Sequence, residues 1–155
     1  AMALICNPKL LIADEPTTAL DVTIQAEILD LIKRLKDEYD TSVLLITHDL
    51  GVVADSADKI AVMYGGRIME IAETRELYSN PMHPYTLGLM QCIPRLNESK
   101  DTLYTIEGNV PDLSSEPKGC EFYDRCNKRI DKCLNSKPAL IERNTNHFVR
   151  CWNHD

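Results

Sequence analysis

The sequence predicts an α/β fold with a parallel sheet, followed by a small, loop-rich extension that contains cysteines. Strand-like and helix-like segments alternate over residues 10–56, which is the pattern of a parallel sheet with crossover helices. Beyond Pro111 the chain is loop-like, and that part holds four of the six cysteines. With 155 residues, 44% of them hydrophobic, the chain has the size and composition of one ordinary globular domain.

The first strand and the first helix are read from the apolar pattern. Residues 10–13 are a short apolar run flanked by proline on one side and acids on the other, which suits a strand buried on both faces. Residues 22–39 are predicted to form a helix with Asp21 as its N-cap. The apolar stripe of this helix, at helical spacing, comprises Ile24, Ile28, Leu31 and Leu35.

The next elements follow in order. Residues 43–46 form a second apolar strand, and a short helix begins at Leu50. Residues 59–64 and 67–71 flank a Gly-Gly pair, which predicts a two-residue hairpin. Prolines punctuate the chain after this hairpin, with a short helix expected over residues 85–92.

Composition excludes several classes of protein. The formal net charge is −7, which argues against a protein that binds the phosphate backbone of nucleic acids. The longest apolar run, residues 1–6, is too short to cross a bilayer. Residues 97–101 form a polar linker. Residues 118–150 hold eight basic and four acidic side chains, a local balance of +4 within an otherwise acidic chain.

Two carboxylates and one imidazole are expected at a common edge of the sheet. Asp14 and Glu15 follow the first strand and His48 follows the second, and ligands bind at the carboxyl ends of parallel strands. Such a carboxylate can hold Mg²⁺ beside nucleotide phosphates, and a second one can activate water. Taken alone, the acids would more often cap the next helix, and His48 would more often be a helix-start residue beside Thr47 or Asp49.

The longer string favours the nucleotide-binding alternative. Residues 14–21, Asp-Glu-Pro-Thr-Thr-Ala-Leu-Asp, and the later Thr-His-Asp at residues 47–49 resemble the Walker B, D-loop and switch motifs of an ABC ATPase, a P-loop NTPase. In the D-loop, many members have Ser in place of Thr18. Residues 14–28 resemble one branch in particular, the ATP-binding subunits of oligopeptide, dipeptide and nickel importers, and the resemblance covers nearly the whole chain.

The resemblance implies a role for each motif residue. Asp14 would position Mg²⁺, Glu15 would be the general base toward the hydrolytic water, and His48 would contact the γ-phosphate of ATP. Asp21 would act across a dimer interface. The implied cofactors are therefore ATP and Mg²⁺, and the full-length subunit would be an ATPase that energises peptide uptake.

The resemblance also implies partners and a location. The partners would be membrane permease subunits, a second ATP-binding subunit in a homo- or heterodimer and, indirectly, an extracellular substrate-binding protein, with no nucleic acid. The protein would lie peripherally on the cytoplasmic face of the membrane. Other subunits would select the transported substrate, so this chain does not name it.

The phosphate-binding half of such a domain is not found in this sequence. No Gly-x-x-x-x-Gly-Lys-Ser/Thr motif occurs, and residues 1–4 resemble the helix that follows the family's signature motif. We therefore expect residues 1–78 to be the C-terminal half of the nucleotide-binding domain and residues 79–155 to be the peptide-importer extension. The isolated chain is expected neither to bind ATP tightly nor to hydrolyse it, and to expose apolar surface.

Four cysteines in the basic tail form the second candidate site. Disulfides are disfavoured in a reducing compartment, and structural zinc usually takes cysteine pairs two to four residues apart. Four thiolates suit a [4Fe–4S] cluster, and nearby basic side chains are expected to lower the pKa of the thiols. An iron–sulfur cluster, zinc and no metal all stay open on spacing alone. The expected ligands are Cys120, Cys126, Cys133 and Cys151.

The resemblance favours the iron–sulfur interpretation of this tail. The His-Pro-Tyr sequence at residues 83–85 and the cysteine segment at residues 119–126 resemble the C-terminal extension of peptide importers, in which a cluster has been characterised. His147 or His154 replacing a thiolate is a weaker alternative, and His83 is expected to pack in a turn. The remaining cysteines, Cys6 and Cys92, are expected to be small core residues.

The sequence disfavours two alternatives to the importer subunit. A stand-alone iron–sulfur or zinc-binding module would have no need of the motif residues Asp14, Glu15, Asp21 and His48. A soluble ABC ATPase that acts on DNA is disfavoured by the acidic balance and by the His-Pro-Tyr extension.

Overall fold

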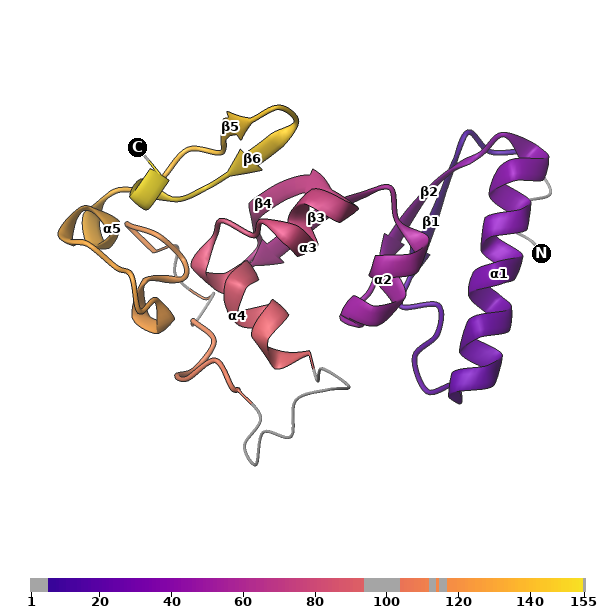
Figure 1. Cartoon of the computed structure of the whole chain (residues 1–155), viewed down its shortest axis with the longest axis horizontal. Coiled ribbons are helices and arrows are strands. Elements are labelled where there is room, and N and C mark those ends of the chain that lie inside the picture. Colours follow the sequence, from indigo (N-terminus) through magenta and orange to yellow (C-terminus); the bar gives the residue numbers. More distant parts are fainter. Residues whose placement is uncertain (1–5, 94–103, 112–113, 115–116, 155) are drawn as a thin grey trace. The chain divides into compact units, whose positions relative to one another are not determined.

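The structure is a computed structural model that describes residues 6–93, 104–111, 114 and 117–154 (Figure 1). The chain forms two compact units, residues 1–57 and 58–155. The expected linker at residues 97–101 and the expected helix at residues 1–4 lie outside the described residues. The domain boundary expected between residues 78 and 79 stays a prediction. The boundary between the two compact units falls earlier in the sequence, between residues 57 and 58, because the C-terminal strands pair with the hairpin that begins at Lys59.

The described part of unit 1, residues 6–57, contains a two-stranded parallel sheet and two helices. Strand β1 (Leu10–Asp14) pairs with strand β2 (Ser42–Ile46) in a register that sets Leu10 opposite Ser42 and Asp14 opposite Ile46. Helices α1 (Val22–Tyr39) and α2 (Leu50–Ser56) follow the two strands. The predicted parallel pairing and the α/β class are confirmed.

Among the described residues of unit 1, 6–57, only one face of this sheet is covered. Side chains along each strand alternate between half-buried and exposed, and Leu10 and Ile12 of β1 are 52% and 59% exposed. The expectation that β1 is buried on both faces is therefore wrong, since every second side chain of the strand is exposed.

Helix α1 has the predicted bounds but a shifted buried face. Asp21 caps it, with its Oδ1 accepting hydrogen bonds from the backbone N–H groups of Thr23 and Ile24. Ile28 and Leu35 of the predicted stripe are half-buried, whereas Ile24 and Leu31 are exposed. The half-buried side chains follow a helical spacing of their own and comprise Gln25, Ile28, Leu29, Ile32, Leu35 and Lys36.

Unit 2 begins with the predicted hairpin. Strands β3 (Lys59–Tyr64) and β4 (Arg67–Glu73) pair antiparallel around Gly65 and Gly66, whose φ angles of 55° and 75° fit a tight hairpin turn. Helices α3 (Thr74–Ser79) and α4 (Pro84–Cys92) come next, and α4 confirms the helix expected there.

The tail is more ordered than a loop. It contains helix α5 (Asp131–Asn135) and strands β5 (Ile141–Asn144) and β6 (His147–Val149), besides the short 3₁₀ turns η2 (Tyr123–Arg125) and η3 (Trp152–His154). Strand β6 pairs with β4, which gives a four-stranded sheet in the order β3-β4-β6-β5. The loop-like expectation missed this pairing because the added strands are only three or four residues long.

The core of unit 2 joins the hairpin to the tail. Tyr64, Met69 and Phe122 form a buried cluster, with the rings of Tyr64 and Phe122 edge to face at 5.1 Å. Next to it, the buried carboxylate of Glu121 lies 2.8 Å from Nε of Arg67 on β4. The tail is thus held by packing and by an ion pair. Among the described residues, no helix combines the length and apolarity needed to span a bilayer.

Candidate functional site

The first candidate site lies at the carboxyl edge of the β1–β2 sheet. Asp14 and Ile46 end the two strands as register partners, and the backbone N–H of Glu15 donates to the carbonyl of Ile46 at 2.8 Å. This bond continues the hydrogen bonding between the two strands one residue beyond the end of β1. Because His48 lies two residues past Ile46, the parallel pairing brings its imidazole next to the Glu15 side chain.

Each carboxylate oxygen of Glu15 holds a side-chain partner. Nδ1 of His48 lies 2.9 Å from Oε1, and the hydroxyl of Thr18 donates to Oε2 at 2.7 Å. The Thr18 hydrogen bond and, after it, the His48 contact hold the pKa of Glu15 below its ordinary value. The hydrogen bond and the charge of Glu15 raise the pKa of His48. The result is an exposed acid–base pair in which ionised carboxylate and protonated imidazole stabilise each other.

The backbone that carries Glu15 is in an unusual conformation. Glu15 has φ 44° and Ala19 has φ 65°, in the left-handed region that residues with a Cβ rarely adopt. Such a residue costs about 1–3 kcal/mol and persists only where its surroundings hold it. Here the N–H of Thr18 donates to the carbonyl of Glu15 at 3.2 Å. The tight turn therefore sets the Thr18 hydroxyl over the Glu15 carboxylate.

The other predicted residues of this site do not join the Glu15 group. Asp14 is exposed on the same face of β1 as Leu10 and Ile12. Asp21 faces the first turn of α1 as its N-cap. Their roles toward Mg²⁺ and toward a second subunit stay predictions. Asp49 caps the beginning of α2, so His48 lies beside a capping residue, as its alternative interpretation had it, and it also contacts Glu15.

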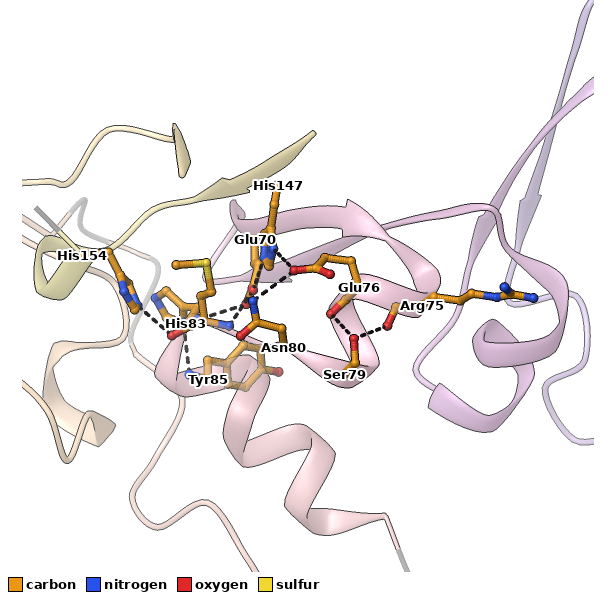
Figure 2. Close-up of polar contacts among 10 residues, drawn as sticks. Glu70, Arg75, Glu76, Ser79, Asn80, His83, Tyr85, His147 and His154 are labelled. Atoms are coloured by element: carbon orange, nitrogen blue, oxygen red, sulfur yellow. Dashed lines mark hydrogen bonds and ion pairs between the residues drawn. The ribbon is translucent and has the colours of Figure 1, made fainter. Parts of the chain in front are cut away.

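A second polar cluster is buried in unit 2 and was not expected from the sequence (Figure 2). Glu70 of β4 is fully buried, and its two oxygens accept from the backbone N–H groups of Met82 and His83 at 2.7 and 2.9 Å. Nε2 of His147, from β6, lies 2.7 Å from Oε1 of Glu70. One carboxylate therefore ties the proline-rich turn and the C-terminal hairpin to β4.

The histidines of unit 2 are engaged in structural contacts. His83 caps α4, with Nδ1 accepting from the N–H of Tyr85 at 3.0 Å, and burial together with nearby His154 lowers the pKa of His83 to about 4. His154 lies 2.9 Å from the carbonyl of Met82. These contacts match the turn-packing role predicted for His83, and they occupy the two histidines that were alternatives to a cysteine ligand.

The four-cysteine site is not assembled in this structure. No three His, Cys, Asp or Glu side chains among the described residues are grouped to hold a metal ion. Cys120 and Cys133 are joined through the backbone, N–H to carbonyl at 2.8 Å, and the thiols of Cys120, Cys126 and Cys133 are close enough to influence one another. Three of the four expected ligands thus lie in one small region, but without metal-binding geometry.

The basic side chains lower the pKa of Cys126 as expected, but burial has the larger effect on the thiols. Burial raises the pKa of Cys120 to about 12, and burial also raises the pKa of Cys126, with Lys128 and Arg129 only partly opposing it. Desolvation of the thiolate outweighs attraction to exposed cations. These pKa directions describe the thiols without a metal, and a bound metal ion would itself deprotonate them. The core role expected for Cys6 is also wrong, since Cys6 is exposed, while Cys92 is half-buried.

Sequence reasoning missed two parts of these sites. The hydrogen bond from Thr18 to Glu15 was not predicted, because Thr18 was considered only as a position of the D-loop motif. Its spacing of three residues from Glu15 is the signal that a turn could join the two. For the Glu70–His147 pair no such signal exists, because 77 residues separate its members and only the β4–β6 pairing brings them together.

Comparison with known proteins supplies the class to which this geometry belongs. Residues 69–133 match the family described as "Oligopeptide/dipeptide transporter, C-terminal region". The chain is 52% identical over 152 residues to the oligopeptide transport ATP-binding protein AppD of Bacillus subtilis, covering 98% of this chain and 46% of that protein. It is 52% identical over 155 residues to the dipeptide transport ATP-binding protein DppD of the same organism, covering 100% and 46%.

Two further matches extend the comparison. The oligopeptide transport ATP-binding protein OppD of Escherichia coli is 52% identical over 152 residues, covering 98% of this chain and 45% of that protein. A solved structure of cbiO1 from Clostridium perfringens, part of the ABC transporter complex cbiONQ, aligns with a TM-score of 0.44 and 33% identity over 47% of this chain and 29% of that chain.

The chain is therefore related to the ATP-binding proteins of transport systems. More particularly, it is similar over nearly its whole length to part of the oligopeptide and dipeptide transport ATP-binding proteins, and residues 69–133 match the C-terminal-region family. The chain spans about half the length of the curated relatives it matches. The resemblance drawn from the Asp14–Ile28 string and from the tail is confirmed.

Proposed function

We propose that this chain supplies the hydrolytic edge of an ATP-binding subunit that energises peptide uptake by an ABC importer. The observation that carries the proposal is the hydrogen-bonded pair of Glu15 and His48 at the carboxyl edge of two parallel strands. The relatives are named as oligopeptide and dipeptide transport ATP-binding proteins, which supports ATP as the nucleotide and a peptide as the cargo.

Each residue has a role that its position can support. Asp14, exposed at the strand end, is the carboxylate that would hold Mg²⁺, a cation that takes one or two protein carboxylates together with water and substrate phosphates. When bound, Mg²⁺ neutralises charge on the phosphates of ATP. Glu15 accepts the proton of the attacking water. Its lowered pKa keeps the carboxylate ionised at neutral pH, which is the form that can accept a proton, although it also makes Glu15 a weaker base.

His48 is poised to exchange one partner for another. In this chain its Nδ1 holds Glu15, and its raised pKa favours the imidazolium form. A cation beside the hydrolytic base is suited to bind a γ-phosphate oxygen. Asp21 remains the residue proposed to act toward a second ATP-binding subunit. Permease subunits, a substrate-binding protein and a peripheral place on the cytoplasmic side of the membrane belong to the same proposal.

The iron–sulfur cluster and the zinc site expected at the four cysteines stay predictions outside this proposal. Among the described residues, no three His, Cys, Asp or Glu side chains are grouped to hold a metal ion. No step is assigned to the cysteines.

The test is ATP hydrolysis by the complete ATP-binding subunit that contains these residues, assembled with its membrane partners. Glu15→Gln should lower kcat by about 10²- to 10⁴-fold, the usual contribution of a general base, with little change in KM for ATP. Glu27→Gln, the same change on the exposed surface of α1, is the matched control and should leave kcat unchanged. A Glu15→Gln subunit that hydrolyses ATP at the wild-type rate would exclude the proposed role.

A further inference from the structure

Thr18 holds the second oxygen of the Glu15 carboxylate. The Thr18 hydroxyl donates to Oε2 at 2.7 Å, a shorter contact than the 2.9 Å between His48 and Oε1. Both contacts are local to unit 1. They fix the carboxylate at two points, so the plane of the group is set as well as its position.

This fixation matters because Glu15 is otherwise free to move. Its side chain is 44% exposed and the His48 side chain 79% exposed, so neither is confined by packing. An exposed glutamate samples several rotamers, whereas a general base must stay within a few tenths of an ångström of its proton. Hydrogen bonds must therefore do what packing does for a buried residue.

The turn that presents Thr18 is built for this contact. The 3.2 Å bond from the Thr18 N–H to the Glu15 carbonyl closes the turn, while a second bond of 3.2 Å joins the Leu20 N–H to the carbonyl of Thr17, which is buried. Glu15 itself is held at φ 44°. The hydroxyl and the carboxylate thus belong to one short backbone unit that does not depend on any ligand.

The two partners of Glu15 differ in what they do when nucleotide binds. Under the proposed function, on which this inference rests, His48 turns toward a phosphate and releases Oε1. Thr18 has no such competing partner in its turn and keeps Oε2. We infer that Thr18 is a positioning residue for the general base: its hydroxyl holds Glu15 through Oε2 and leaves Oε1 to accept the proton of water.

Three threonine variants of the assembled subunit test this inference. Thr18→Val keeps the shape of the side chain and removes the donor, Thr18→Ser keeps the donor, and Thr23→Val is the same change on the exposed first turn of α1. Thr18→Val should lower kcat for ATP about tenfold to a hundredfold, the range seen when a reacting group is misplaced. KM for ATP should stay within about twofold of wild type, because only positioning is lost. Thr18→Ser and Thr23→Val should keep wild-type kcat.

A second measurement decides the inference without reference to ATP hydrolysis. The ring carbon and proton NMR resonances of His48, assigned with His48→Gln, report the position of the Glu15 carboxylate at one fixed pH without nucleotide. They should move in Thr18→Val and stay in place in Thr18→Ser and Thr23→Val. Unmoved resonances in Thr18→Val would overturn the inference.

The outcomes separate the inference from the proposed function. Loss of activity in Glu15→Gln with wild-type kcat in Thr18→Val overturns the inference and leaves the function standing. Wild-type activity in Glu15→Gln overturns the function, and the His48 resonances then decide whether Thr18 still orients Glu15. A Thr18→Val subunit whose KM rises while kcat is unchanged would also overturn the inference, since it would place Thr18 in nucleotide binding.

Discussion

The oxygen atoms of Glu15 illustrate how single contacts set the chemistry of an exposed group. Without Thr18 and His48, this carboxylate would be an ordinary surface acid with several rotamers. In unit 2 it is burial that sets the pKa, because it disfavours the charged form: it lowers the pKa of His83 and raises that of Cys120. At the scale of the residue, hydrogen bonds govern the first site and desolvation governs the second unit.

The buried His83 makes the stability of unit 2 depend on pH. Its pKa is about 4 in the folded chain, against 6.5 when exposed, so the unfolded chain binds the extra proton first as pH falls. The stability contributed by neutral His83 is therefore fully present above about pH 6.5 and is lost as pH falls toward 4. The loss amounts to about 3 kcal/mol at most, from the size of the pKa difference.

Trp152, the only tryptophan and a residue of unit 2, allows that loss to be measured by fluorescence during urea unfolding. His83→Asn can still cap α4 and has no proton to gain, so its stability should fall less between pH 6.5 and 4 than that of the wild type. His48→Asn, in the other unit, should retain the wild-type fall. Equal pH dependence in His83→Asn and wild type would show that His83 does not cause it.

Thiol reactivity provides a second residue-scale prediction. Cys6 is exposed, whereas the pKa of Cys120 is about 12 because of burial, so at pH 7 only about 10⁻⁵ of the Cys120 thiol is ionised. Iodoacetamide should therefore modify Cys6 well before Cys120, as read by peptide mass spectrometry. In guanidinium the difference should vanish. Fast modification of Cys120 in the folded chain would contradict the burial-raised pKa.

At the scale of the element, a helix or strand could be predicted where the residues that determine it lie within or next to it in the sequence. Helix α1 was predicted from Val22 to Tyr39, because its cap and its apolar periodicity lie within the element itself. The hairpin of β3 and β4 was predicted from its Gly-Gly turn. Strands β5 and β6 could not be predicted, since Ile141–Asn144 shows no apolar alternation and the strands exist through pairing with β4. The Glu15–His48 contact was foreseeable from parallel pairing, but the Glu70–His147 contact was not.

Glu70 should be the largest single contributor among the polar contacts that join these elements. Its oxygens accept from the partly buried N–H of Met82 and the buried N–H of His83, and Oε1 contacts the buried ring of His147. In Glu70→Gln the amide would turn an N–H group toward a donor, which leaves buried donors without an acceptor. We expect a loss of about 2–4 kcal/mol in the free energy of unfolding, typical of a broken buried charged contact.

Urea unfolding followed by Trp152 fluorescence measures this loss. The matched control is Glu73→Gln, three residues further along at the end of β4, where the side chain is exposed and makes no cap hydrogen bond to α3. It should change stability by less than about 0.5 kcal/mol. If the two variants unfold at the same urea concentration, Glu70 does not hold the turn and the hairpin to β4.

At the scale of the whole molecule, the uncovered face of the β1–β2 sheet is the main liability. Leu10, Ile12, Leu44 and Ile46 lie on the exposed positions of the paired strands and are 52%, 59%, 49% and 44% exposed. Ile12 and Leu44 are direct register partners, so the apolar side chains form one patch rather than scattered points. Contiguous apolar surface of this kind is covered by other protein in most soluble molecules.

The isolated 155-residue chain should therefore self-associate through this face. Sedimentation velocity should show a mean mass that rises with concentration over the micromolar range, and Ile12→Lys should return the chain toward monomer, because a charge at the centre of the patch must stay hydrated. Val110→Lys removes an apolar side chain of 66% exposure in unit 2 and should leave the association unchanged. If Val110→Lys and Ile12→Lys shift the mass equally, association is a general effect of charge, and the uncovered sheet face is not its cause.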